Sequence, residues 1–243
     1  MDIEVDGVGE DVWQSWVRDW NWVLGAVSAK HCDHDVARLE ISPPASDEIW
    51  ERVTKAIGIT PPRSFESVVR TRSARVAMHW ALDGEDPLIG GVMMPTWGGR
   101  HRGDRTGLWC LEDHPALKDT YDNWIRVCWD QPMWDDNEYL RGYADAWYSK
   151  LPFIEVADGD LIAFDMSEGP HHGSVVYLCH DEYCEIHGKR LGDDFADFIA
   201  KWSRIGCVGP EGWEIEKFYA DDQIQVDGER AAAWRAWLGD PDA

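Results

Sequence analysis

The sequence predicts an α+β fold in which a small sheet carries a helix across one face. Two short apolar runs, at residues 161–164 and 174–179, are separated by a polar loop, as expected for neighbouring strands. The first run is apolar at every position, which indicates a strand covered on both faces. Apolar residues then recur at the spacing of a helix with one apolar side, at Phe195, Phe198, Ile199 and Trp202.

The remaining elements follow from the same spacing rules. We expect strands at 74–82, 108–111 and 153–156 to join 161–165 and 174–179 in one twisted sheet, the first with a single apolar face. Ser46 should cap a helix that ends at Gly58, and Thr60 with two prolines should open the next one. A further helix should open at His114-Pro115. The helix after Asp135 should turn five residues inward: Tyr139, Leu140, Tyr143, Ala146 and Trp147.

The chain contains 16 tryptophans, and several of them recur at helical spacing near the N-terminus. Flat aromatic faces also stack on sugars, so a carbohydrate-binding helix is one interpretation. Regular helical spacing favours the other, in which the stripe docks the helix onto the domain. The stripe consists of Trp13, Trp16, Val17, Trp20, Leu24 and Val27.

The chain is expected to divide into a main domain and two extensions. Ser42-Pro43-Pro44 is typical of a boundary. Residues 1–45 would form a Trp-rich helical extension packed on a domain at 46–213. Residues 214–243 would form a C-terminal helical tail, anchored by Trp234 and Trp237.

The composition narrows the class of partner. Of 243 residues, 46 are Asp or Glu and 23 are Lys or Arg, which gives a net charge of −23. Such a field repels nucleic acid and anionic membranes and attracts basic partners. No apolar run is long enough for a membrane span, and the acidic first residues do not resemble a signal peptide. We therefore expect a cytoplasmic protein whose six cysteines are reduced.

The sequence contains only weak signals for a catalytic site. Three aspartates flank one predicted strand: Asp158, Asp160 and Asp165. Two of them could form a carboxylate pair that acts in acid–base catalysis or binds a cation. We favour the other interpretation, in which they belong to ordinary turns. Cys179 and His180 would need a third group to act as nucleophile and base. The basic Gly-rich loop at 96–107 lacks the Gly-Lys-Ser/Thr of a phosphate loop. No closed zinc spacing is present. We expect no metal, no cofactor and no enzymatic activity.

Several motifs carry a family resemblance. They are DGDLIAFD at 158–165, GSVVYLCHD at 173–181, HGKRLGDDFADF at 187–198 and GCVGPEGW at 206–213. PPRSFESVV at 61–69 is similar to a helix-opening LPxxYxxLL, without the leading leucine. Together they resemble bacterial members of the SMI1/KNR4 family, the SUKH superfamily, over roughly residues 50–213.

The resemblance implies a single SMI1/KNR4-like domain, a twisted central sheet covered by helices, and a non-catalytic binding role. It also implies structural roles for the motif residues: Trp80, Asp158, Gly159, Asp160, Gly173, Val175, His180, Asp181, His187, Gly188, Leu191, Phe195, Phe198 and Trp213.

Two binding functions compete. Bacterial relatives are mostly regarded as immunity proteins that neutralise a toxin domain, often a nuclease, from a polymorphic or contact-dependent toxin system. The basic cleft of a nuclease would suit an acidic partner. The alternative is a scaffold or regulator of a cellular protein, for example in cell-envelope control. Loops and helix starts at strand ends supply the candidate partner-binding residues, which are Asp135, Asp136, Glu138, Glu168, Asp181 and Glu182.

Overall fold

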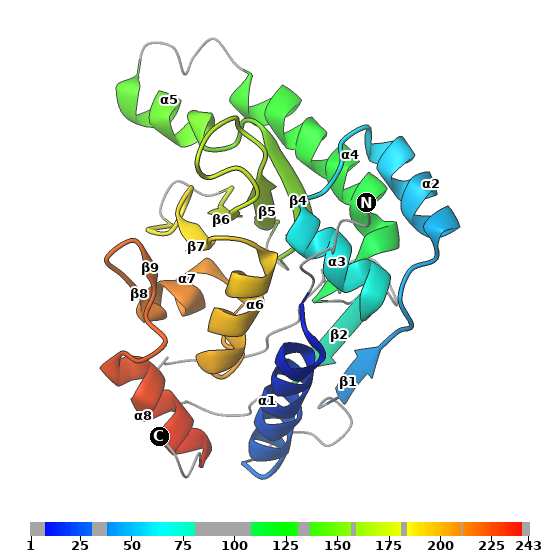
Figure 1. The fold of residues 1–243 in the computed structure, drawn as a ribbon. Helices are drawn as coiled ribbons and strands as arrows, with labels where there is room; N and C mark the ends of the chain where they lie inside the picture. The colour runs from blue at the N-terminus through cyan, green and yellow to red at the C-terminus, as the bar shows by residue number, and fades with distance from the viewer. Residues whose placement is uncertain are drawn as a thin grey trace.

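The computed structural model describes residues 8–30, 38–80, 108–130, 137–156, 159–180, 184–209 and 211–239 (Figure 1). Its helices are α1 (Glu10–Ser28), α2 (Asp47–Ile57), α3 (Arg63–Thr71), α4 (His114–Trp124), α5 (Glu138–Asp145), α6 (Phe195–Arg204), α7 (Gly212–Ile215) and α8 (Glu229–Leu238). Single 3₁₀ turns form η1 (Leu111–Asp113) and η4 (Glu216–Phe218), and α4 continues into a π-helix, η2 (Ile125–Trp129).

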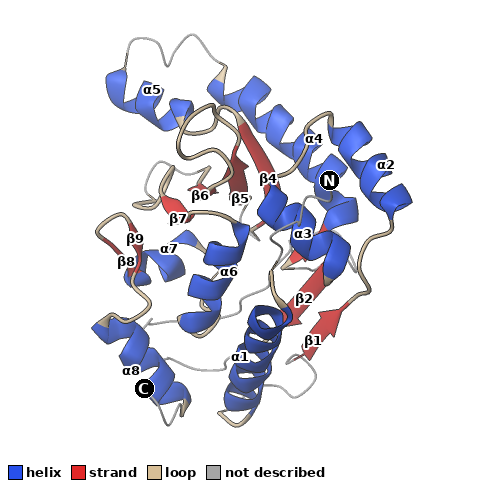
Figure 2. Cartoon of the chain, in the orientation of Figure 1, coloured by secondary structure: helices blue, strands red, loops and turns tan. Residues whose placement is uncertain are grey.

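The central sheet contains four antiparallel strands in the order β4 (Lys150–Glu155), β5 (Leu161–Asp165), β6 (Val175–Leu178) and β7 (Arg190–Gly192). Phe164 pairs with Val175 across β5 and β6. The mixed helix-and-strand arrangement in Figure 2 confirms the α+β class.

The expectation of one shared sheet is wrong for the two earlier strands. β2 (Arg75–His79) pairs with β1 (Arg38–Ile41) and β3 (Trp109–Cys110) in a separate three-stranded sheet. Val76, Met78 and Trp80 of the apolar face expected for residues 74–82 are buried, and Ala77 on the other face is buried as well. A third, two-stranded sheet joins β8 (Tyr219–Ala220) to β9 (Gln223–Ile224).

Both faces of the central sheet are covered, as the apolar run at 161–164 indicates. Alternate residues of β5 and β6 point to opposite sides. Ile162, Phe164 and Tyr177 belong to the main core, which also contains Phe195 of α6. The second face carries an aromatic cluster from α4, η2, α5 and the segment after α5. Its buried members are Tyr121, Trp129, Tyr143, Ala144, Trp147, Leu161, Ala163, Val176 and Leu178.

α1 packs its tryptophans into the main core. Trp13 and Trp20 contact the ring of Trp109 edge-on, with centroids 6.4 and 6.1 Å away. The indole N–H of Trp20 donates to the hydroxyl of Ser203 on α6, at 2.9 Å. Lys30, after α1, lies over Trp237 of α8. The Trp stripe is therefore packing surface, although the division at residues 45 and 213 stays a prediction.

Local capping signals match the structure. The Ser46 side chain accepts a hydrogen bond from the backbone N–H of Ile49, and Gly58 ends α2 with a φ of 69°. Asp194 caps α6 in the same way. One orientation expected for the helix after Asp135 is wrong, because Tyr139 is 63% exposed. None of the helices in the described residues combines the length and apolar character that spanning a bilayer requires.

Candidate binding surface

Asp160 is the centre of a buried polar network that joins several of the motif residues. Its side chain is almost completely buried. Oδ2 accepts a hydrogen bond from the hydroxyl of Tyr177 at 2.8 Å, and Oδ1 accepts the backbone N–H of His180, also at 2.8 Å. His180 Nδ1 donates to the same Oδ1 at 2.6 Å. The carboxylate therefore ties the turn before β5 to the end of β6.

The geometry of this network argues against both catalytic hypotheses, the Cys179–His180 pair and the carboxylate pair. Asp160 does orient His180, but Cys179 packs in the main core with Tyr177, whereas the His180 ring lies against Trp124. Asp165 lies at the far end of β5, about 16 Å along a five-residue strand. It has its own partners, Lys150 at 3.3 Å and the N–H of Ser167 at 2.9 Å. Asp160 and Asp165 therefore form no carboxylate pair.

His187 connects the end of β6 to α5. Its Nδ1 accepts the backbone N–H of Cys179 at 3.0 Å, so Nε2 carries the proton and donates to the carbonyl of Tyr143 at 2.9 Å. The His187 and Tyr143 rings stack with centroids 3.6 Å apart. Burial lowers the pKa of His187, which keeps this imidazole neutral. The Tyr143 hydroxyl donates to the Cys179 carbonyl at 2.8 Å, which closes the link.

Two glycines are required by close packing around this network. Gly188 has a φ of 69°, and a Cβ there would lie 2.9 Å from the Cβ of Ala146. A Cβ on Gly192 would lie 2.6 Å from the backbone nitrogen of Phe198, which is closer than any real contact. These positions allow β7 to approach α6 and the segment after α5.

The structure places the other motif residues in varied surroundings. Gly159 lies beside Trp124 and His180, and Gly173 lies against Pro62. Trp213 is 39% exposed and lies beneath the Lys217 ammonium, 4.9 Å from the ring centroid. Asp158 and Asp181 lie outside the described residues. Those in the main core are Trp80, Val175, Leu191, Phe195 and Phe198.

Three large aromatic or apolar side chains are exposed on the helical layer over the second face. Val127 on η2 is 50% exposed, Tyr139 on α5 is 63% exposed and Tyr148, after α5, is 36% exposed. Trp129 of η2 packs on Tyr143 of α5, with ring centroids 5.5 Å apart, so the two helices form one layer (Figure 1). π-Helical turns occur frequently at functional sites.

Two acidic residues of α5 are exposed and form no hydrogen bond or ion pair among the described residues. Glu138 and Asp145 lie at the two ends of α5, and within the described part of the chain neither side chain makes a hydrogen bond or ion pair. Asn137 caps α5 by accepting the N–H groups of Tyr139 and Leu140. We call the set Val127, Glu138, Tyr139, Asp145 and Tyr148 the α5 surface.

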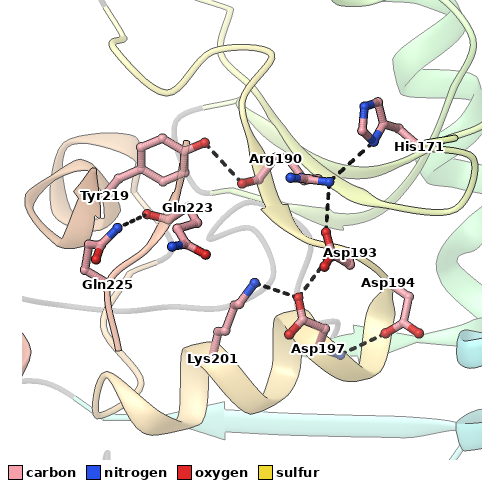
Figure 3. Close-up of polar contacts among 9 residues, drawn as sticks. All are labelled: His171, Arg190, Asp193, Asp194, Asp197, Lys201, Tyr219, Gln223 and Gln225. Carbon is pink, nitrogen blue, oxygen red and sulfur yellow. Dashed lines mark hydrogen bonds and ion pairs between the residues drawn. The ribbon is translucent and has the colours of Figure 1, made fainter. Parts of the chain in front are cut away.

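Several acidic residues elsewhere form ion pairs or hydrogen bonds within the protein. Figure 3 shows the region around β7 and α6, where Arg190 lies between His171, at 3.3 Å, and Asp193, at 2.9 Å. Asp197 pairs with Lys201 at 2.7 Å and also accepts the N–H of Asp193. This region presents paired charges, unlike the α5 surface.

Two of the six expected partner-binding residues fall within the described residues. Glu138 belongs to the α5 surface. Glu168 is exposed on the β5–β6 loop. Among the described residues, no hydrogen bond or ion pair connects Glu168 to Glu138. Asp135, Asp136, Asp181 and Glu182 lie outside the described residues. The sequence analysis missed Tyr139 because helical spacing alone places it on the side of Tyr143, which is buried.

The fold and the surface define a mixed α+β module with a buried structural network and an exposed aromatic–acidic layer. The model of the SMI1 / KNR4 family (SUKH-1) matches residues 44–201, and the chain belongs to this family. Its members are generally non-catalytic binding domains. Among curated proteins, none matches this sequence.

Proposed function

We propose that this chain is an immunity protein that binds and neutralises a basic toxin domain through the α5 surface. The observation that carries the proposal is the presence on one helix of an exposed tyrosine, Tyr139, and of two exposed carboxylates, Glu138 and Asp145, which form no hydrogen bond or ion pair among the described residues. Family membership supports a binding role.

Charge supports the choice of partner. A net charge of −23 accelerates encounter with a basic surface and disfavours nucleic acid as a ligand. A nuclease toxin carries a basic cleft for its own substrate, and an acidic helix that enters this cleft would block it. Carboxylates without internal partners lose no internal ion pair when they bind a partner's Lys or Arg.

Tyr139 is suited to anchor the complex. Tyrosine is enriched among the residues that contribute most to protein interfaces, because it contributes a large contact area and loses little rotamer freedom. The Tyr148 hydroxyl donates to Asp130 at 3.1 Å, which joins the segment after α5 to the residue that follows η2.

The test uses a basic nuclease-type toxin domain, purified in inactive form. We expect a one-to-one complex, and Tyr139→Ala should weaken it by about 2 kcal/mol, roughly 30-fold in affinity. Calorimetry measures the affinity, and survival of toxin-expressing cells measures neutralisation. Ile41→Ala is the matched control, because Ile41 is also exposed but lies on β1.

Two results would contradict the proposal. One is tight binding that Tyr139→Ala leaves unchanged, which would place the interface elsewhere. The other is absence of binding, together with a growth or envelope phenotype on deletion in toxin-free cells. That second result would favour a scaffold or regulator.

A further inference from the structure

α5 is attached to the rest of the protein through few buried side chains. Tyr143 and Ala144 are the buried residues of this helix, and its other side chains are exposed or half-buried. Elements with little buried apolar surface open locally at a free energy well below that of global unfolding. The contacts of Tyr143, the larger of the two buried side chains, therefore largely determine how firmly α5 is held.

Tyr143 is joined to the end of β6 and to His187 by three contacts. Its hydroxyl donates to the carbonyl of Cys179 at 2.8 Å, and its ring stacks on His187 with an interplanar angle of 10°. Its backbone carbonyl accepts a hydrogen bond from His187 Nε2 at 2.9 Å. This carbonyl lies in the last turn of α5, where backbone oxygens lack partners within the helix. His187 thus caps the C-terminal end of α5 with its side chain.

This arrangement requires the neutral form of His187. Nδ1 accepts the backbone N–H of Cys179 at 3.0 Å, whereas Nε2 donates to the Tyr143 carbonyl, so one ring nitrogen must remain an acceptor. Protonation would place a second ring proton on Nδ1, facing the N–H of Cys179. Two donors would then oppose each other, and the Cys179 N–H would lose its acceptor. The protonated ring therefore does not fit the closed arrangement.

The titratable and charged groups around His187 favour different forms of the ring. Burial disfavours the imidazolium and has the largest effect, so the pKa of His187 lies below its ordinary value of 6.5. The Tyr143 carbonyl and the Asp160 carboxylate oppose this in part. Burial raises the pKa of the Tyr143 phenol, which stays neutral. Cys179 and Cys184 bond to His187 through backbone groups.

We propose that His187 is a pH-sensitive latch, which holds α5 on the end of β6 when neutral and lets α5 open when protonated. Opening exposes the imidazole to water, where it takes up a proton near pH 6.5. Because the closed form binds this proton less readily, acid shifts the equilibrium towards the open form. The α5 surface is then no longer held in one position. The latch concerns the chain alone and does not depend on the partner proposed above.

Hydrogen exchange of the full-length protein, measured by mass spectrometry at about pH 7 and about pH 5.5, tests the latch. The rates are corrected for the intrinsic pH dependence of amide exchange. We expect the protection of residues 138–148 to fall several-fold, and by at most about tenfold, because each pH unit below 6.5 favours protonation of the open form tenfold. His114→Phe is the control, since it removes a fully buried imidazole on α4 and should leave this fall unchanged.

Two further variants separate titration from packing. Gln can donate an amide N–H but binds no proton in this range, so His187→Gln should give α5 the same protection at both pH values. His187→Asn, with a smaller amide, carries the same prediction and replaces it if the first variant does not fold. Tyr143→Phe removes the hydrogen bond to Cys179 but keeps the imidazole. Its protection should be lower at both pH values, and the fall with pH should persist.

Three results would overturn the proposal. The first is wild-type protein in which the protection of α5 is the same at the two pH values. The second is a fall in the His187 variants as large as that in the wild type. The third is a fall that His114→Phe abolishes, because α5 would then exchange through global unfolding.

Discussion

His180 Nδ1 lies 2.6 Å from Asp160 Oδ1, and the same oxygen accepts the backbone N–H of His180. The other oxygen of Asp160 accepts the Tyr177 hydroxyl. A carboxylate in the turn before β5 therefore determines how the end of β6 is held. The arrangement resembles a catalytic dyad, but Cys179 lies on the other side of the strand.

Asp160→Asn should destabilise the fold strongly. The amide cannot accept all three hydrogen bonds, and removal of one member of a buried charged network leaves the others unsatisfied. We expect a loss of about 3 kcal/mol in the free energy of unfolding, measured by urea denaturation. Asp193→Asn is the control, because its exposed pair with Arg190 should contribute less than about 0.5 kcal/mol. Equal losses in both variants would contradict a structural role for Asp160.

His114 should make the fold sensitive to acid. Burial lowers the pKa of His114 from 6.5 to about 3, so the folded protein keeps this imidazole neutral. The unfolded chain binds a proton below pH 6.5 and the folded one does not. The stability that the neutral His114 contributes is therefore fully present above pH 6.5 and is lost as the pH falls towards 3. By pH 5 the loss amounts to about 2 kcal/mol.

His114→Phe tests this dependence. The His114 ring stacks on Phe65 at 5.0 Å, so a phenyl ring suits the surroundings. Whatever the variant costs near neutral pH, its stability should fall less than that of the wild type as pH decreases. Parallel stability curves for the two proteins between about pH 7 and 5 would show that His114 is not responsible.

Two glycine-to-alanine substitutions should have opposite effects. Gly192→Ala should destabilise by about 3 kcal/mol, because its Cβ would meet the backbone of α6 at 2.6 Å. Gly142→Ala lies within α5, where a Cβ meets nothing within 4 Å, and should stabilise by roughly 0.5–1 kcal/mol. Thermal unfolding measures both. Tolerance of alanine at position 192 would mean that β7 and α6 do not require this close approach.

Local signals in the sequence predicted much of the fold. Ser46, Gly58 and Asp194 interact with backbone groups a few residues away, so α2 and α6 follow from short stretches of sequence. Strand pairing depends on distant residues, and β1, with its alternating charges, gave no sign that it would pair with β2.

The candidate site was less predictable for the same reason. The acidity of the region around α5 is visible in the composition, and Glu138 was among the expected residues. The exposure of Tyr139 and Val127 depends on how η2 and α5 pack on the sheet, which periodicity does not report. The contacts that commit Asp193 and Asp197 to internal pairs are likewise visible only in three dimensions.

The central claim is that the acidic α5 surface receives a basic toxin domain. Its most direct test is the association rate of that domain with the double variant Glu138→Lys and Asp145→Lys, measured by stopped-flow fluorescence at low and moderate salt. We expect roughly tenfold slower association at low salt, and a smaller difference at about 0.15 M, where charges are screened. Glu48→Lys with Glu51→Lys on α2 changes the net charge equally and should slow association much less. Equal slowing by both pairs, or rates indifferent to salt, would contradict the account.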